Sequence, residues 1–169
     1  MESTLKLGIL TLSDSCSRGE RIDTSGPAIA DLLSPFSPEI VEKAIIPDDL
    51  AIIKSTLLDW TRSGQLNLII TTGGTGVGPR DVTPEATRAV IDKEIPGLAE
   101  LMRLEGLKHT PMAVIGRGIA GIAGDSLIVN LPGSERSVRE NLKVILPVLG
   151  HILDLVSGET EHPPRESGI

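Results

Sequence analysis

A glycine-rich segment flanked by two aspartates is the part of this chain best suited to phosphate chemistry. The segment is Thr72-Gly73-Gly74-Thr75-Gly76, with a further glycine at position 78. Glycine permits the tight turns that bring several backbone N–H groups into one concavity, and such a concavity binds phosphate oxygens. We therefore expect nucleotide phosphates to bind here, held by the N–H groups of Gly73, Gly74, Gly76 and Gly78.

Asp48 and Asp81 are the candidate catalytic and metal-binding residues beside this segment. A divalent cation that bridges phosphate oxygens needs oxygen ligands, and Mg²⁺ is the natural candidate. A simpler role is open for each carboxylate. Asp48 or its neighbour Asp49 would cap the next helix, and Asp81 would pair with Arg80 or brace the turn that contains it.

Two common nucleotide motifs are excluded. No Gly-Lys-Ser/Thr follows the glycine segment, which excludes a Walker A loop, and Pro79 and Asp81 stand where a dinucleotide fingerprint needs glycine. Residues 116–121 do match G-x-G-x-x-G, but the element that follows them is a predicted strand and not a helix. We therefore interpret residues 116–121 as a turn with no nucleotide role.

The composition indicates a globular protein and argues against nucleic-acid and membrane partners. The chain has 169 residues, 40% of them hydrophobic, and a formal net charge of −7, which suits one globular domain and argues against broad binding to nucleic acid or an anionic membrane. Its aromatic residues, Phe36 and Trp60, provide no platform for stacked bases. Cys16 is the single cysteine, and no apolar run reaches the length of a membrane helix. We expect a cytoplasmic protein.

The elements that position these residues follow from hydrophobic patterning. Short apolar runs alternate with segments of helical period, which predicts strands separated by crossover helices. Strands are predicted at 5–12, 39–46, 66–71, 120–123 and 127–131, and helices at 27–33, 50–63, 83–92, 97–107 and 135–156. The predicted fold is a single three-layer α/β/α domain with a mostly parallel central sheet, over residues 1–157, followed by a flexible tail at 158–169.

Three local predictions are more specific. Residues 112–115 are expected to form a second short edge strand or half of a hairpin. Thr83 should cap the helix that follows it, since Pro84 and Glu85 are typical of a first turn. Pro147 should kink or split the last helix, because proline cannot donate a helical hydrogen bond.

Four polar loops follow four of the predicted strands. They are Ser13-Asp14, Pro47-Asp48, the glycine segment at 72–76, and Pro132-Gly133-Ser134. If these strands are parallel, their carboxyl ends meet at one edge of the sheet, where open α/β folds bind ligands. Loops of this kind are also rich in Gly, Asp and Ser simply to turn the chain, but four together favour a binding site.

The loops resemble those of a known family, the molybdopterin adenylyltransferases of molybdenum-cofactor biosynthesis, which include the bacterial Mog proteins and their MoaB relatives. The resemblance runs from about Leu5 to Val156. It is carried by Thr11-Leu12-Ser13-Asp14, Asp23-Thr24-Ser25-Gly26-Pro27, Ile46-Pro47-Asp48, Thr71-Thr72-Gly73-Gly74-Thr75-Gly76, Pro79-Arg80-Asp81-Val82-Thr83-Pro84-Glu85-Ala86 and Asn130-Leu131-Pro132-Gly133-Ser134.

The resemblance implies a MogA/MoaB-like molybdopterin-binding fold, a homotrimer, and transfer of AMP from ATP to the molybdopterin phosphate. The product would then pass to a molybdenum-insertion protein, a possible partner. By resemblance, Asp48 and Asp81 are catalytic and hold Mg²⁺, and residues 72–76 bind the nucleotide. The residues that would bind molybdopterin are Ser13, Asp14, Ser25, Gly26, Pro132, Gly133 and Ser134.

Two other functions remain open at this stage. One is a non-catalytic molybdopterin carrier or scaffold of the MoaB type, which would keep the pocket without transferring AMP. The other is a hydrolase that cleaves nucleotide pyrophosphates with water as the attacking group. The chain departs from many relatives after Ser134, where it has Glu135 in place of proline. This departure affects the expected molybdopterin contacts alone.

Overall fold

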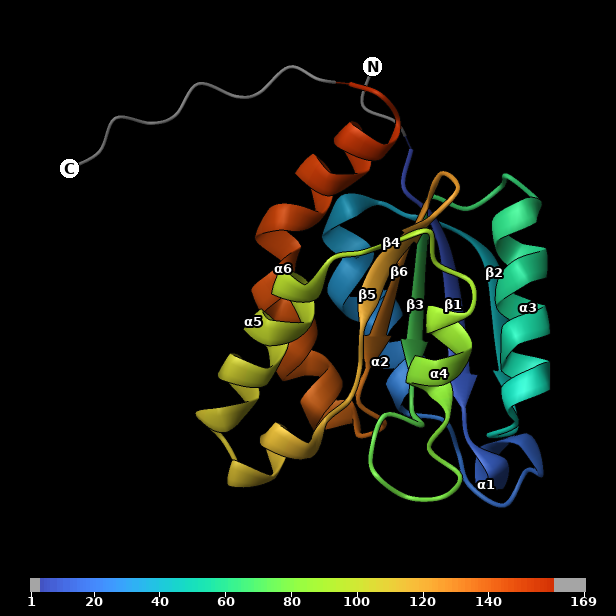
Figure 1. Cartoon of the computed structure of the whole chain (residues 1–169), viewed down its shortest axis with the longest axis vertical. Coiled ribbons are helices and arrows are strands. Elements are labelled where there is room, and N and C mark those ends of the chain that lie inside the picture. Colours follow the sequence, from blue (N-terminus) through green and yellow to red (C-terminus); the bar gives the residue numbers. More distant parts are fainter. Residues whose placement is uncertain (1–3, 160–169) are drawn as a thin grey trace.

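The centre of the molecule is a six-stranded sheet, seen in a computed structural model that describes residues 4–159. Its strands lie in the order β2-β1-β3-β6-β5-β4 (Figure 1). Four of them are parallel: β1 (Lys6–Leu12), β2 (Glu39–Ile46), β3 (Leu68–Thr72) and β6 (Ser126–Leu131). Two short strands, β5 (Ala120–Ala123) and β4 (Lys93–Glu94), extend the sheet with antiparallel pairing. The predicted mostly parallel sheet is confirmed.

Helices cover both faces of this sheet, which makes the three layers that the patterning predicts. One face carries α2 (Ser25–Leu33), α5 (Pro96–Leu107) and α6 (Glu135–Val156), and the other carries α3 (Leu50–Arg62) and α4 (Thr83–Arg88) (Figure 1). Three one-turn elements complete the fold: α1 (Asp14–Ser17) and the 3-10 helices η1 (Ser34–Phe36) and η2 (Pro111–Ile115).

β3 shows why the strands lie where they do. All five of its residues are buried, and their side chains alternate between the two faces. Leu68 and Ile70 pack into the core beneath α2, α5 and α6, whereas Ile69 packs into the core beneath α3 and α4. A strand covered by helices on both faces has to be apolar throughout, so the predicted central position of β3 is confirmed.

Two predicted elements are wrong. Residues 112–115 lie in η2, because Pro111 starts a helical turn and the Thr110 hydroxyl accepts a hydrogen bond from the N–H of Met112 (3.2 Å). The helix predicted over 83–92 ends at Arg88. After it, the chain turns into β4, which pairs with β5 and was not predicted.

The expected effect of Pro147 is also wrong in part, because α6 continues through it as one helix. Proline leaves the carbonyl of the residue four positions earlier without its helical donor. Here that residue is Lys143, which lies on the exposed side of α6. The apolar face of α6, with Leu142, Ile145 and Leu149, stays packed on the sheet.

None of the helices within residues 4–159 is long and apolar enough to cross a membrane. Of the predicted tail at 158–169, residues 160–169 lie outside the described part of the chain.

Gly8 offers a test of the packing between β1 and α3. A Cβ at Gly8 would lie 3.0 Å from the Leu66 side chain and from the Trp60 ring, so Gly8→Ala overpacks this core. We expect it to lower the free energy of unfolding by about 1 kcal/mol in urea titration. Gly150→Ala, where no atom lies within 4 Å of the new Cβ, should raise it by about 0.5 kcal/mol. Equal effects would contradict the packing argument.

Candidate active site

The carboxyl ends of the four parallel strands meet at one edge of the sheet, as predicted, at the bottom of Figure 1. Their loops line a polar hollow of about 270 Å³. The predicted site residues that line it are Ser13, Ser25, Asp48, Thr72, Gly73, Gly74, Asp81, Gly133 and Ser134. Thr75, Gly76 and Pro132 line a second, more apolar hollow of about 260 Å³ with residues of α5 and η2. The two hollows therefore share the glycine loop and the loop after β6.

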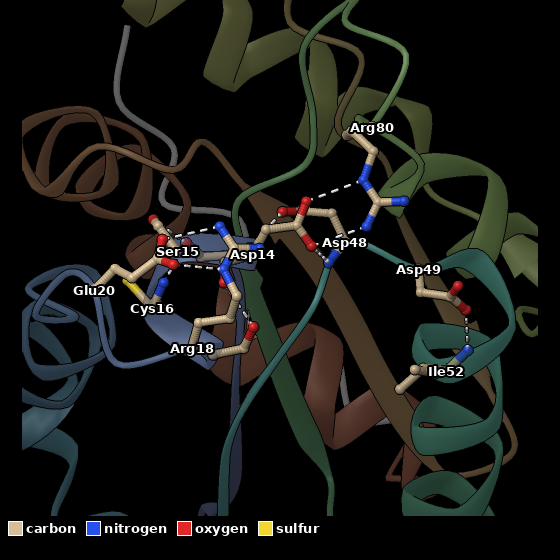
Figure 2. Close-up of polar contacts among 11 residues, drawn as sticks. Asp14, Ser15, Cys16, Arg18, Glu20, Asp48, Asp49, Ile52 and Arg80 are labelled. Carbon is tan, nitrogen blue, oxygen red and sulfur yellow. Dashed lines mark hydrogen bonds and ion pairs between the residues drawn. The ribbon is translucent and has the colours of Figure 1, made fainter.

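Asp48 is held in place by Asp14, the first residue of α1 (Figure 2). The Asp14 N–H donates to Asp48 Oδ2 (3.0 Å), and the Asp48 N–H donates to Asp14 Oδ1 (3.1 Å). The guanidinium of Arg80 donates two hydrogen bonds to the same Asp14 carboxylate, from Nε (3.0 Å) and from Nη2 (2.9 Å). Asp14, predicted to bind molybdopterin, thus uses its carboxylate to position Asp48 and Arg80.

The surroundings of Asp48 and Asp14 shift the pKa values of these two carboxylates in opposite directions. Partial burial raises the pKa of Asp48, and the negative charges of Asp14 and Asp81 raise it further. The hydrogen bond from the Asp14 N–H acts in the other direction and offsets part of this rise in pKa. The hydrogen bonds from Arg80 lower the pKa of Asp14. A cation bound beside Asp48 would relieve the repulsion that its ionised form experiences.

The alternatives for Asp48 and Asp81 are now separated. The cap of α3 is Asp49, whose carboxylate accepts from the Ile52 N–H (3.0 Å), so Asp48 is not the cap (Figure 2). Asp81 does brace its turn, because its Oδ2 accepts from the Gly78 N–H (2.8 Å). Arg80 pairs with Asp14 and leaves Asp81 without an ion pair in the described part of the chain.

The glycine loop holds a set of N–H groups that differs from the predicted one. Gly73 and Gly74 have φ of 101° and 65°, which favours glycine. The Gly73 N–H donates to Leu131 O (3.1 Å) and the Gly78 N–H donates to Asp81 Oδ2, so both of these N–H groups already have protein acceptors. Within residues 4–159, the N–H groups of Gly74, Thr75 and Gly76 have no protein acceptor. Three consecutive donors therefore remain for an anion.

Thr83 fixes this loop and is not the helix cap. Its hydroxyl donates to Gly73 O (2.9 Å), and its N–H donates to Gly74 O (3.1 Å). The cap position of α4 falls on Val82. A Cβ at Gly74 would lie 2.3 Å from the Thr83 hydroxyl and 3.0 Å from Asp48 Oδ1, so only glycine fits between them.

Several predicted hydroxyls point inward to other loops. Ser25 Oγ donates to Gly133 O (2.6 Å), and Thr72 Oγ1 donates to Pro132 O (2.7 Å), so the loop after β6 is joined to the start of α2 and to the end of β3. Ser13 caps α1 and Ser134 caps α6. The walls of the hollow are therefore built by the residues that were expected to touch the ligand.

Asp23 is a site residue that sequence reasoning missed. Its carboxylate accepts from the Thr11 hydroxyl (2.8 Å) and from the N–H groups of Ser25 and Gly26 (3.0 Å each). Gly26, predicted to bind molybdopterin, leaves room for this carboxylate, because a Cβ there would lie 2.5 Å from Asp23 Oδ2. An aspartate two and three residues before such N–H groups is typical of a local turn, and this pattern could have revealed it.

The cations near the hollow are few. Arg18, Arg136 and Arg139 form ion pairs with other acidic side chains, at Glu20, Glu140 and both Asp31 and Glu135 respectively. Arg80 reaches the site through Asp14, and Arg21 lines the hollow. Arg117, in the turn predicted at 116–121, contacts the glycine loop and was also missed.

The acidic groups fit a metal that arrives with a ligand. Among the described residues, no three His, Cys, Asp or Glu side chains are arranged to hold a metal ion on their own. Asp48 and Asp81 nevertheless line the same hollow. Mg²⁺ commonly binds through one or two carboxylates together with substrate phosphates and water, and two aspartates beside free N–H donors suit that arrangement.

Comparison with known proteins agrees with this geometry. The family model described as "Probable molybdopterin binding domain" matches residues 8–151. The chain belongs to this family. It is 41% identical to the molybdopterin adenylyltransferase of Helicobacter pylori strain J99 over 157 residues, which cover 92% of this chain and 89% of that protein.

Other members of the family set the range of similarity. The crystal structure of the molybdopterin biosynthesis enzyme MoaB from Thermus thermophilus is 52% identical and superposes with a TM-score of 0.87, over 92% of this chain and 98% of that one. The molybdenum cofactor synthesis protein cinnamon of Drosophila melanogaster is 44% identical over 94% of this chain, which spans only 26% of that longer protein. The predicted MogA/MoaB-like fold is confirmed.

Asp48→Asn tests whether the ionised Asp48 carboxylate destabilises the folded protein. Because the folded protein raises the pKa of Asp48, folding favours its protonated form, and the contribution of Asp48 to the free energy of unfolding falls as pH rises above the ordinary aspartate value of 3.8. We expect Asp48→Asn to melt about 2 °C higher than the wild type at pH 7 without ligand. The difference should shrink as pH falls to 4. A variant that melts lower at pH 7 would contradict this origin.

Proposed function

We propose that this chain transfers AMP from ATP to the phosphate of molybdopterin and releases pyrophosphate. One observation carries the proposal: Asp48 and Asp81 line one hollow with Gly74, the first of three consecutive glycine-loop residues whose N–H groups have no protein acceptor within residues 4–159. The relatives named molybdopterin adenylyltransferase support it, because they match the chain at about 40% identity over most of its length.

The proposed reaction brings together two phosphate-bearing molecules. The molybdopterin phosphate oxygen attacks the α-phosphorus of ATP in line, and pyrophosphate leaves. The bond from the α-phosphorus to the bridging oxygen breaks as the new bond to the molybdopterin phosphate forms. The main tasks of the protein are to align the two groups and to disperse their charge, so no covalent intermediate with the protein is required.

The proposal gives each residue of the glycine loop and both aspartates a role. In this proposal the N–H groups of Gly74, Thr75 and Gly76 hold nucleotide phosphate oxygens. Asp48 and Asp81 hold Mg²⁺, which would neutralise charge on the triphosphate. Thr72 and Gly73 support the loop through their bonds to Pro132 and Leu131.

The second substrate needs its own space beside the first. The two hollows meet at the glycine loop, and a transfer between two bound molecules requires adjoining sites of this kind. We assign molybdopterin contacts to Ser13, Gly133 and Ser134, which line the polar hollow, and nucleotide contacts to the glycine loop, whose Thr75 and Gly76 line the other hollow. Asp14, Ser25, Gly26 and Pro132 are assigned a supporting role, since their polar groups or their space are occupied by neighbouring loops.

Asp81→Asn and Asp48→Ala test the catalytic assignment. Each removes a carboxylate that the proposed transition state needs, so we expect pyrophosphate release with ATP, Mg²⁺ and molybdopterin to fall by about 100-fold or more. Asp59→Asn, on α3 away from the hollow, is the matched control and should leave the rate unchanged. Turnover near the wild-type rate in both site variants would refute the assignment.

The same assay separates the alternative functions. A transferase releases pyrophosphate only when ATP, Mg²⁺ and molybdopterin are all present. A molybdopterin carrier would bind the pterin and release no pyrophosphate. A nucleotide hydrolase would cleave ATP without any pterin.

Assembly and location belong to the same proposal. We propose a homotrimer that passes its product to a molybdenum-insertion protein in the cytoplasm, where the lone thiol of Cys16 stays reduced.

Exposed apolar side chains on α5 and η2 support association: Leu104, Met112 and Val114 are 62%, 62% and 64% exposed. Light scattering should give three times the mass of the chain, and Met112→Glu should lower it. A monomer mass for the wild type would exclude the trimer.

A further inference from the structure

The segment that carries Asp81 has few contacts of its own with the core. It runs from Gly76, at the end of the glycine loop, to Val82, where α4 begins. Residues 77–80 are exposed, and Val77 is 67% exposed. Its internal hydrogen bonds join Asp81 to Gly78 in both directions, which closes the turn on itself without fixing it to the rest of the molecule. Arg80 joins one side of the segment to Asp14, in the first turn after β1. A second connection reaches the segment from the turn before β5.

Arg117 makes that connection from the turn between η2 and β5. Its Nε donates to Gly76 O (2.7 Å), and its Nη2 donates to Asp81 O (2.7 Å). Its Nη1 bonds to the Glu85 carboxylate in the first turn of α4. One guanidinium therefore contacts the start of the segment, its catalytic aspartate and the helix that follows.

The chemistry of these contacts requires arginine. A guanidinium presents donors in a fixed planar fork, so a single side chain can satisfy acceptors that approach from different directions. A lysine ammonium at this position would be a point charge on a flexible stem and could not hold all three in the same geometry. The hydrogen bond from Arg117 also lowers the pKa of Glu85, as a cationic donor does for a carboxylate partner.

Arg117 is itself fixed to the folded core. Its backbone N–H donates to Thr75 O (2.8 Å), which ties it to the buried part of the glycine loop. Arg103 of α5 donates through Nη1 to Gly118 O (3.2 Å) and Gly116 O (3.4 Å), on either side of Arg117. Gly118 lies so close to β6 that a Cβ would be 2.9 Å from Asn130 O. The contacts of Arg117 therefore start from a rigid part of the molecule.

We infer that Arg117 is a positioning residue, which fixes residues 76–82 so that the Asp81 carboxylate stays beside the glycine loop and faces the polar hollow. Arg117 touches neither substrate in this account. It acts through the carbonyls of Gly76 and Asp81 and through Glu85. The catalytic consequence rests on the proposed AMP transfer, whereas the effect on the segment itself does not.

Arg117→Gln is the first test. This substitution removes the guanidinium and keeps a polar side chain, so we expect residues 76–82 to become more mobile and the Asp81 carboxylate to be displaced. We expect kcat for pyrophosphate release to fall by about 30- to 100-fold and the Mg²⁺ concentration for half-maximal rate to rise, while the KM for molybdopterin changes by less than about twofold. Arg117→Lys should recover only a small part of the lost rate. The matched control is Arg88→Gln, which breaks a surface ion pair with Glu94 at the other end of α4.

Hydrogen exchange of the unliganded protein gives a readout that does not depend on activity. In Arg117→Gln, amides within 76–82 should exchange about tenfold faster than in the wild type, while those of β3 and β6 keep their rates. Unchanged exchange in 76–82, or turnover within twofold of the wild type, would overturn the inference. Faster exchange across the whole chain in both Arg117 variants would also overturn it, since Arg117 would then be a general stabilising residue.

The two proposals fail differently. If the wild type releases no pyrophosphate while Arg117→Gln still loosens residues 76–82 selectively, AMP transfer is refuted and the positioning role stands. If the wild type is active and Arg117→Gln matches it, the positioning role is refuted and AMP transfer stands.

Discussion

The bidentate ion pair between Arg80 and Asp14 is the contact on which the geometry of the site depends. It joins the segment after the glycine loop to the first turn after β1, two parts of the chain that are 66 residues apart. The same Asp14 exchanges hydrogen bonds with Asp48, so a single carboxylate sets the position of a second one. Parallel strands bring acidic loops to one edge of the sheet, and Arg80 compensates part of their charge.

The parallel part of the fold was predictable because its signals are local and strong. A run of apolar residues such as Leu68 to Ile70 has to be covered on both faces, and that requirement places β3 at the centre and its loop at the ligand edge. The elements that escaped prediction depend on distant partners. β4 is two residues long and exists only because β5 lies beside it. Residues 112–115 are apolar and were predicted as a strand, but the cap at Thr110 and the proline at 111 start a 3-10 helix there.

The site was predictable at the level of loops but not of individual atoms. Sequence placed Asp48 and Asp49 side by side and could not say which one caps α3, because either carboxylate has the required reach. It could not show that the Gly73 N–H is used by the sheet, since that depends on Leu131 of a strand far along the chain. Arg117 escaped for the same reason: its acceptors Gly76 and Glu85 lie 41 and 32 residues away.

Two parts of the wall of the polar hollow are held to the rest of the molecule by different kinds of bond. Hydroxyl groups of Ser25 and Thr72 secure the loop after β6 to its neighbours through neutral carbonyl acceptors. The opposite wall, with Asp81, depends on the charged side chains of Arg80 and Arg117. Dissolved ions screen exposed charges far more than they weaken neutral hydrogen bonds. We therefore expect rising ionic strength to weaken the ion pair of Arg80 with Asp14 more than the hydroxyl contacts of Ser25 and Thr72.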